Sequence, residues 1–385
     1  KVKSSLQALK DMALLYRNNL DIKVVGITGS VGKTSTKETI SYVLNKKYKV
    51  LKTEGNFNNE IGLPLTVFRL RDDDEVAVLE MGISDFGEMD RLSKIAQPDI
   101  SVITNIGLCH LENLKTRDGI LKAKTEIFNN MKPDGIAILN GDDDKLITVD
   151  EVNGKKPERF GINYKDGVYA KDIENLGLSG TKFVISGLNC VDGCKDFEVT
   201  VPVPGHHMIY NALAAACVGA ALELTSTQIA DGIADLKTIS GRNNIIKTSK
   251  YTLIDDCYNA NPVSMKASVD VLDMAIGRKV CILGNMYELG ENEKNLHYDV
   301  GQYIGTKNID VLITIGDLAR HIAMGTDDYM ETHFGSYDCE IHSFDDMEEF
   351  NMAYSSILKD NDNILIKASH AMKFADIVEL LSKDN

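Results

Sequence analysis

The sequence predicts an α/β protein built on two doubly wound, mainly parallel sheets. Apolar, strand-like runs alternate with helical stretches, a glycine-rich loop follows the first of these runs, and the alternation restarts after residue 242. Strands that alternate with helices form parallel sheets, because each helix carries the chain back across the sheet. At 385 residues the chain is also too long for one ordinary core, so we expect more than one domain.

The first part of the chain predicts a helix followed by a strand–helix alternation. Apolar residues recur at helical spacing in residues 1–20, which predicts one amphipathic helix. Strands are then predicted at 24–28, 76–80, 101–105 and 136–140, with helices at 35–45 and 119–130. Residues 151–203 carry many turn residues and short segments typical of antiparallel strands, which predicts a β-rich flank. Helices are expected after Gly205 and over 226–236.

The alternation restarts after a predicted hinge at residues 237–242. Strands are predicted at 251–255, 279–283, 311–315 and 363–367, each followed by helical sequence. This predicts a second, smaller α/β domain of Rossmann-like type. We therefore expect a linker helix over 1–20, a central domain over 21–238 and a C-terminal domain over 239–385. The aspartate runs at 72–74 and 142–144 are interpreted as solvated turns.

Composition argues against two classes of protein. The net charge is −15, which disfavours a protein that wraps nucleic acid. No apolar run approaches the roughly 20 residues that span a bilayer, and the start does not resemble a signal peptide, so we expect a cytoplasmic protein. The seven cysteines are scattered, which favours reduced thiols. Cys190 and Cys194 form one close pair, but a metal site would require a second pair.

The most informative segment is an apolar strand that runs into a glycine-rich loop. The loop reads Thr28-Gly29-Ser30-Val31-Gly32-Lys33-Thr34-Ser35. In such loops backbone N–H groups surround phosphate oxygens, the lysine reaches the β- and γ-phosphates, and the hydroxyl after it can bind Mg²⁺. Ile27 stands where the general pattern has glycine. We predict a nucleoside triphosphate site here, and a purely structural glycine turn is the alternative.

Three further residues follow strand ends or lie on a predicted helix. Glu80 ends a predicted strand and could hold Mg²⁺ beside Thr34, whereas an isolated glutamate would more often be a surface acid. His110 follows another strand end, where structural and functional roles are equally plausible from the sequence alone. Lys124 lies on a predicted helix, on which a solvated lysine is the ordinary interpretation.

Two polar clusters complete the candidate sites. Asn56, Asn58 and Asn59 precede a glycine and a proline, so they form either a turn or a site for a polar ligand. The segment Asp255–Pro262 follows a predicted strand of the second domain. Its dense donors and acceptors suit a sugar or a base edge, and a capped turn is the alternative.

Together these segments resemble the Mur ligase family, in the family's order and over nearly the whole chain. The motifs that carry the resemblance are Thr28-Gly29-x-x-Gly32-Lys33-Thr34, Asn56-Phe57-Asn58-Asn59-x-x-Gly62-x-Pro64, Glu80-Met81-Gly82, Thr104-Asn105-Ile106-Gly107-x-x-His110, Pro204-Gly205-x-His207 with Asn211, Gly241-Arg242, Asp255-Asp256-x-Tyr258-Asn259-Ala260-Asn261-Pro262, and Glu288-Leu289-Gly290 with His297.

The resemblance implies an ATP-dependent amide ligase of peptidoglycan precursor synthesis. The substrates would be UDP-N-acetylmuramoyl-tripeptide, whose carboxylate is activated as an acyl phosphate, and D-Ala-D-Ala, whose amine attacks it. The cofactors would be ATP and two Mg²⁺ ions, and the protein would be a monomer in the bacterial cytoplasm. Domain closure is also implied, because phosphate-loop and second-domain residues would serve one ATP.

The family pattern assigns roles to residues that match it. The catalytic set would be Lys33, Lys124, His110 and Arg242, and the metal set Thr34, Glu80 and His110. Lys124 matches a lysine that is carbamylated in several relatives. Contacts to ATP would come from Thr28, Gly29, Ser30, Gly32, Lys33, Thr34, Ser35, Asn211, Arg242, Asp256, Asn259 and Asn261. Contacts to the other substrates would come from Asn56, Asn58, Asn59, Lys367 and His370.

The chain departs from the family pattern in several places. The family's Lys-Gly-Ser-Arg segment reads Lys367-Ala368-Ser369-His370, which replaces an arginine by a weaker donor. Asn285 stands in place of an aspartate, Met208 in place of an asparagine, and Thr125 in place of a frequent glycine. The chain also begins at the helix that follows the family's N-terminal UDP-binding domain, which was either removed or never present. A related ligase with another acid and amine, and an NTPase without ligase activity, are the alternatives.

Overall fold

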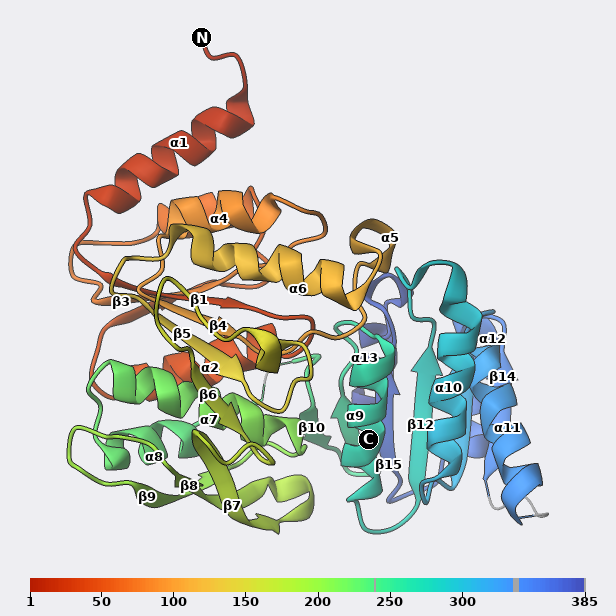
Figure 1. Ribbon diagram of the computed structural model, residues 1–385. Coiled ribbons are helices and arrows are strands. Elements are labelled where there is room, and N and C mark those ends of the chain that lie inside the picture. Colours follow the sequence, from red (N-terminus) through yellow and green to blue (C-terminus); the bar gives the residue numbers. More distant parts are fainter. Residues whose placement is uncertain (239, 335–338, 384–385) are drawn as a thin grey trace. The chain divides into compact units, whose positions relative to one another are not determined.

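The computed structural model describes residues 1–238, 240–334 and 339–383, which form two compact units (Figure 1). Unit 1 comprises residues 1–175, 181–202 and 206–236, and unit 2 comprises residues 176–180, 203–205 and the chain from 237 onward. Residue 239, in the predicted hinge, lies outside the described residues. Within the described ranges, no helix has both the length and the apolar character that a membrane span requires.

Unit 1 is organised around a sheet whose order is β2-β3-β1-β4-β5-β6-β7-β8-β9. The strands from β2 to β7 run parallel, and β8 and β9 are antiparallel to their neighbours. Their bounds are β1 Lys23–Thr28, β2 Val50–Lys52, β3 Val76–Glu80, β4 Ile100–Ile103, β5 Ile136–Asn140, β6 Glu158–Gly161, β7 Val168–Asn175, β8 Thr181–Ser186 and β9 Asp196–Val201. The central strands are buried on both faces, as parallel strands between helix layers must be.

Helices cover both faces of this sheet (Figure 1). On one face lie α1 (Ser5–Asn18), α3 (Gly62–Val67), α4 (Glu88–Ala96) and α6 (Arg117–Thr125), whose apolar residues share one core with the sheet. On the other lie α2 (Lys33–Leu44), α7 (His207–Ala221) and α8 (Ser226–Ala234). Short helices α5 (Leu111–Leu114), η1 (Glu126–Asn130) and η2 (Leu146–Thr148) connect the larger elements.

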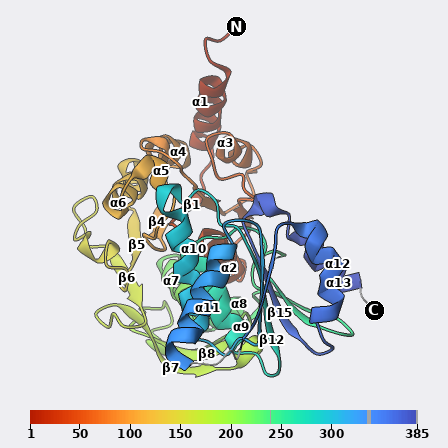
Figure 2. The same cartoon turned by 90° about the vertical axis from the view of Figure 1, so that its right-hand side faces the viewer.

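Unit 2 holds a sheet of order β10-β11-β15-β12-β13-β14, parallel except for the β10–β11 pair. Its strands are β10 Asn244–Lys247, β11 Thr252–Asp255, β12 Lys279–Gly284, β13 Val311–Ile315, β14 Glu340–Phe344 and β15 Asn363–Lys367. Figure 2 shows α9 (Pro262–Asp273), α10 (Glu293–Gly305) and α11 (Arg320–Phe334) on one face, and α12 (Met347–Ile357) and α13 (Ala375–Lys383) on the other. Short helices η3 (Gly177–Ser179), η4 (Gly290–Asn292) and η5 (His370–Met372) also belong to this unit.

The structure confirms the predicted fold class, including the β-rich flank, which continues the first sheet as β6–β9. The first helix is shorter than predicted and covers Ser5–Asn18. Residues 142–144 form a turn, as predicted, and Asp144 is exposed, but Asp142 departs from the solvated interpretation because its carboxylate accepts hydrogen bonds from three backbone N–H groups and from the Tyr210 hydroxyl. A carboxylate bound in this way fixes the turn after β5 rather than facing water, and these bonds lower its pKa although burial opposes them.

Candidate active site

The phosphate loop is held in shape by its own glycines and by the chain that follows β4. Gly29 has a φ of +153°, and a Cβ there would lie 1.9 Å from the Thr104 hydroxyl oxygen, so only glycine fits. The Asn105 side chain accepts a hydrogen bond from the Val31 N–H at 2.9 Å and donates one to the Val31 carbonyl at 2.9 Å. Gly32, at φ +82°, precedes α2, whose first residue is Lys33. The loop is therefore preorganised, with the N-terminal end of a helix next to it.

Two lysines share one carbonyl of this loop. The Lys33 ammonium donates to the Gly29 carbonyl at 2.8 Å, and the Lys124 ammonium donates to the same oxygen at 2.9 Å. Lys124 comes from α6 and is 1% exposed. Its burial, together with the nearby charge of Lys33, lowers its pKa from 10.5 to about 7. Lys124 is thus not the solvated lysine that a surface helix would carry, and a large part of it is uncharged at neutral pH.

His110 lies at the start of α5, where the charges of Lys33 and Lys124 affect its pKa. Burial lowers its pKa to about 4, and the charges of Lys124 and Lys33 add to the shift. The ring is therefore neutral at pH 7, which is the form of histidine that binds metals. Its φ of +49° lies in the left-handed region, which is uncommon for residues other than glycine. A costly backbone conformation that the surroundings enforce is typical of functional sites.

Glu80 ends β3 as a deeply buried carboxylate, of which one oxygen accepts a hydrogen bond and the other has no hydrogen-bond partner. It is 2% exposed, its Oε1 accepts from the Asn58 amide at 2.9 Å, and its Oε2 has no hydrogen-bond partner. The Lys37 ammonium, on α2, lies 3.9 Å from Oε2. Buried carboxylate oxygens normally have a partner, so this oxygen fits a cation ligand. No group of three or more His, Cys, Asp or Glu side chains in the described ranges could hold a metal. A Mg²⁺ ion bound by one carboxylate, a hydroxyl and substrate phosphates does not need such a group.

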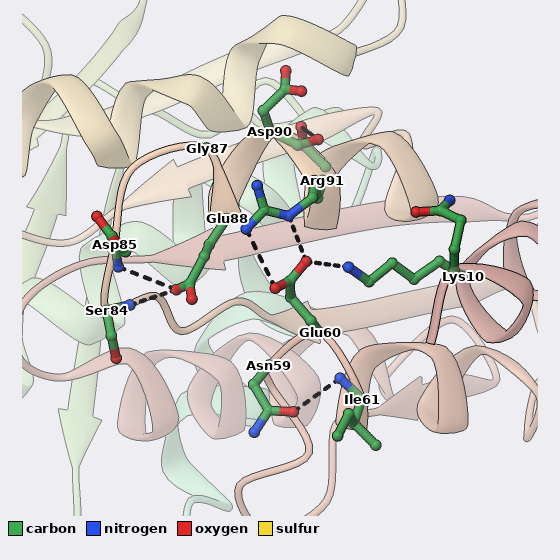
Figure 3. Close-up of polar contacts among 12 residues, drawn as sticks. Lys10, Asn59, Glu60, Ile61, Ser84, Asp85, Gly87, Glu88, Asp90 and Arg91 are labelled. Carbon is green, nitrogen blue, oxygen red and sulfur yellow. Dashed lines mark hydrogen bonds and ion pairs between the residues drawn. The ribbon is translucent and has the colours of Figure 1, made fainter. Parts of the chain in front are cut away.

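The asparagine cluster lies in the loop between β2 and α3. Asn56 is exposed, Asn58 donates to Glu80, and the Asn59 side chain accepts from the N–H groups of Ile61 and Gly62. Figure 3 shows Glu60 of this loop between Lys10 of α1 and Arg91 of α4. The loop is therefore attached to two helices. Of its three asparagines, Asn56 is exposed, Asn58 contacts Glu80, and Asn59 stabilises its own turn.

The remaining unit 1 candidates surround the start of α2. Asn211, on α7, accepts a hydrogen bond from the Thr36 hydroxyl at 2.9 Å through Oδ1, and this oxygen would lie 3.6 Å from a Cβ on Gly32. Ser30 donates to the Gly107 carbonyl at 3.1 Å, and the buried Thr28 hydroxyl has no hydrogen-bond partner. Thr34 and Ser35 lie in the first turn of α2 and are partly exposed. The structure thus brings Thr28 to Ser35 and Asn211 together at one end of the sheet.

In unit 2, Asp256 and Lys367 form a buried ion pair at neighbouring strand ends. Lys367 ends β15 and donates to Asp256 Oδ2 at 2.6 Å and to the Asn259 carbonyl at 2.9 Å. Ser268 of α9 also donates to Oδ2, and Asp256 Oδ1 accepts from the Asn243 N–H at 3.1 Å. Lys367 is 2% exposed. Asp256, expected to contact ATP, and Lys367, expected to contact another substrate, are therefore direct partners of each other.

Arg242 and His370 flank one aromatic ring of unit 2. The Arg242 guanidinium lies 4.2 Å from the centroid of the Tyr258 ring, and the His370 ring centroid lies 5.6 Å from it. Asn261 caps α9 through the Ser264 N–H, and Asn259 caps its own loop through the Ala260 N–H. The capped-turn interpretation thus accounts for the side-chain oxygens of these two asparagines.

Comparison with known protein families decides what this arrangement is. Residues 27–219 match the Mur ligase middle domain, and residues 241–370 match the Mur ligase glutamate ligase domain. The chain belongs to the Mur ligase family. The two matched segments contain the phosphate loop, Glu80, His110 and Lys124 in the first, and Arg242, Asp256, Lys367 and His370 in the second.

Similar proteins carry the name of one Mur ligase. The chain is 38% identical, over 381 residues, to UDP-N-acetylmuramoyl-tripeptide–D-alanyl-D-alanine ligase of Bacillus subtilis (strain 168), and this match covers 98% of the chain and 80% of that protein. A crystal structure of MurF from Acinetobacter baumannii superposes with a TM-score of 0.89 at 30% identity, covering 100% of this chain and 82% of that one. MurF ligase from Thermotoga maritima in complex with ADP superposes with a TM-score of 0.85 at 31% identity, covering 100% and 84%.

Sequence reasoning about this Mur ligase missed three contributors to the site. Asn105, whose side chain hydrogen-bonds the Val31 backbone, follows a strand end within the Thr104-Asn105-Ile106-Gly107 motif, but the sequence assigned it no role. Lys37, one turn after Lys33, is 2% exposed and donates to the Thr53 carbonyl at 2.7 Å. Thr53 in turn accepts from the Glu80 N–H at 3.0 Å. The only available signal for Lys37 was its place one turn beyond Lys33 on the buried helix after the loop.

Proposed function

We propose that this protein joins D-Ala-D-Ala to UDP-N-acetylmuramoyl-tripeptide in an ATP-dependent, ADP-forming reaction of peptidoglycan precursor synthesis. The observation that carries the proposal is the 38% identity to the Bacillus subtilis enzyme of that name across 98% of the chain. The preorganised phosphate loop with Lys33 at the start of α2 supports the use of ATP. A cytoplasmic location and a monomeric state are part of the same proposal.

The chemistry proceeds in two balanced steps. An oxygen of the tripeptide carboxylate attacks the γ-phosphorus of ATP, and the bond to the bridging oxygen breaks, which gives an acyl phosphate and ADP. The amine nitrogen of D-Ala-D-Ala then attacks the acyl carbon, phosphate leaves, and the amine releases a proton. Negative charge accumulates on the transferring group, so cationic and N–H donors at the loop stabilise the transition state.

The proposed roles of the site residues are to bind the phosphates and ribose of ATP and to hold Mg²⁺. Lys33 would neutralise charge on the transferring phosphoryl group, and Arg242 and Asp256 would contact ATP phosphate and ribose. Thr34, Glu80 and His110 would hold Mg²⁺, which when bound supplies charge neutralisation and orients the phosphates. The Glu80 Oε2, which has no hydrogen-bond partner, and the neutral ring of His110 support these assignments.

Lys124 is proposed to be carbamylated. A neutral amine is required to attack CO₂, forming an N–C bond and releasing a proton, and a pKa of about 7 supplies that form at neutral pH. ¹³C NMR of the protein equilibrated with ¹³C-bicarbonate should show a carbamate signal that is lost in Lys124→Met. An identical signal in the variant would contradict the assignment.

Phosphate release with ATP and Mg²⁺ tests the function when the two other substrates are added separately and together. Release that depends on the tripeptide nucleotide, with an amide product only when both are present, supports the ligase. Release independent of both would support an NTPase instead. A product formed with another acid and amine, and not with this pair, would support the related-ligase alternative, which the His370 replacement favours.

A further inference from the structure

In the loop between β2 and α3, Asn58 contacts the turn after β3 through both its side chain and its backbone, whereas the Thr53 hydroxyl at the start of the loop accepts from the Glu80 N–H. Its side-chain amide donates to Glu80 Oε1 at 2.9 Å, and its backbone carbonyl accepts from the Gly82 N–H at 2.9 Å. A Cβ on Gly82 would lie 3.1 Å from the Asn58 side-chain carbon Cγ, so Gly82 provides the space in which this amide lies. Asn58 therefore contacts both sides of the Glu80-Met81-Gly82 turn.

The direction of the side-chain bond follows from chemistry. An ionised carboxylate only accepts hydrogen bonds, so the Asn58 amide must present its nitrogen to Glu80. The bond fixes Oε1 and thereby the rotation of the carboxylate, while Oε2 stays without a hydrogen-bond partner. Lys37 is 3.9 Å from Oε2, which exceeds hydrogen-bond distance, and its ammonium donates to the Thr53 carbonyl instead.

The loop that carries Asn58 is itself well anchored. The Asn59 side chain accepts from two backbone N–H groups of the next turn, at 3.1 and 2.9 Å. Gly62 approaches the Phe57 backbone so closely that a Cβ would lie 2.4 Å from the Phe57 Cα. Glu60 binds Arg91 of α4 and Lys10 of α1, as Figure 3 shows. These contacts fix the loop, and they thereby fix the position of the Asn58 amide next to Glu80.

We propose that Asn58 is a positioning residue that orients the Glu80 carboxylate toward a bound divalent cation, rather than a contact to the acyl substrate. The proposal rests on the proposed function, in which Glu80 binds the metal of ATP. Groups that hydrogen-bond a metal ligand fix its orientation, and their loss typically reduces metal affinity by about 10- to 100-fold. Asn58 meets this description, with Glu60 as the anchor of its loop.

The test measures metal binding rather than turnover. Mn²⁺ serves as a paramagnetic probe, and its dissociation constant is measured by EPR in the presence of ADP, while ADP affinity is measured separately in EDTA. Asn58→Ala should raise the Mn²⁺ dissociation constant by about 10-fold or more and leave ADP affinity in EDTA unchanged. The matched control is Asn56→Ala, in the same loop and exposed, which should leave Mn²⁺ affinity unchanged.

A second variant guards against a folding defect. Glu60→Gln loosens the loop from α1 and α4 without altering Asn58, and it should weaken Mn²⁺ binding in the same direction by a smaller factor. Equal Mn²⁺ affinities for Asn58→Ala and Asn56→Ala would overturn the proposal, as would a parallel loss of ADP affinity in EDTA. If the unmodified protein forms no amide product from the two substrates and ATP, the proposed function fails instead, so the two failures are distinguishable.

Discussion

Replacing the buried Lys124 by methionine is predicted to stabilise the protein while removing a group of the active site. The Lys124 ammonium is 1% exposed and its pKa falls from 10.5 to about 7 on folding. In the unfolded chain the lysine is protonated up to pH 10.5, so between pH 7 and 10.5 the unfolded state binds more protons. The free energy of unfolding of the unmodified protein therefore rises with pH across this window.

The magnitude follows from the shift. A fall of about 3.5 units between these two pKa values corresponds to about 4 kcal/mol of stability that is missing at pH 7 and recovered near pH 10.5. The hydrogen bond to the Gly29 carbonyl offsets about 1–2 kcal/mol of that cost. Methionine fills a similar volume without a charge. The free energy of unfolding of Lys124→Met should thus exceed that of the unmodified protein by about 2–3 kcal/mol at neutral pH.

The assay is urea unfolding of both proteins at pH 7 and pH 10 in CO₂-depleted buffer. The difference between their free energies of unfolding removes the contributions of other titrating groups. The variant should be more stable at pH 7, and its advantage should shrink or reverse at pH 10. A variant that is less stable at pH 7, with a difference that does not change with pH, would refute the reasoning about the buried amine.

Three further predictions concern other charged residues. Lys33→Ala should abolish ATP-dependent phosphate release, because the loop loses the charge that neutralises the transferring phosphoryl group, and near-normal release would contradict the phosphate-loop assignment. The Glu60 pKa is lowered, first by its hydrogen bond to Arg91 and also by Lys10, so its stabilising effect is present above about pH 4.5 and is lost as pH falls through the lower folded pKa. The stability difference between the unmodified protein and Glu60→Gln should accordingly vanish in acid, and a difference that persists there would contradict the ion pair. Lys367→Met leaves the buried Asp256 carboxylate unpaired and should cost about 3–5 kcal/mol by urea unfolding, whereas adding Asp256→Asn should recover part of the loss. An equal loss in the double variant would show that the pair does not account for the effect.

The sequence predicted the elements whose signals are local. The strand before the phosphate loop, the helix after it and the four predicted strands of unit 2 all have apolar runs bounded by turn residues, and each appears in the structure. The strands β10 and β14 were missed because they are edge strands whose residues are only partly buried or exposed. Edge strands lack the continuous apolar run of a strand buried on both faces.

Side-chain partners were harder to predict than elements. The burial of Lys124 could have been inferred, since it lies four residues after the buried Ile120 and next to the buried Ala123 on one helix. The contact between Asn58 and Glu80 joins residues 22 apart, and that between Asp256 and Lys367 joins residues 111 apart. Both depend on strand order, which sequence spacing does not provide, so the candidate residues were predicted but their partners were not.

The most direct test of the central claim is detection of the ligated product by mass spectrometry, with ATP, Mg²⁺, UDP-N-acetylmuramoyl-tripeptide and D-Ala-D-Ala supplied together. We predict an amide-linked UDP-muramoyl pentapeptide in amounts equal to the ADP and phosphate released, and none with Lys33→Ala. ATP hydrolysis that proceeds without product, and at the same rate when either substrate is omitted, would contradict the account.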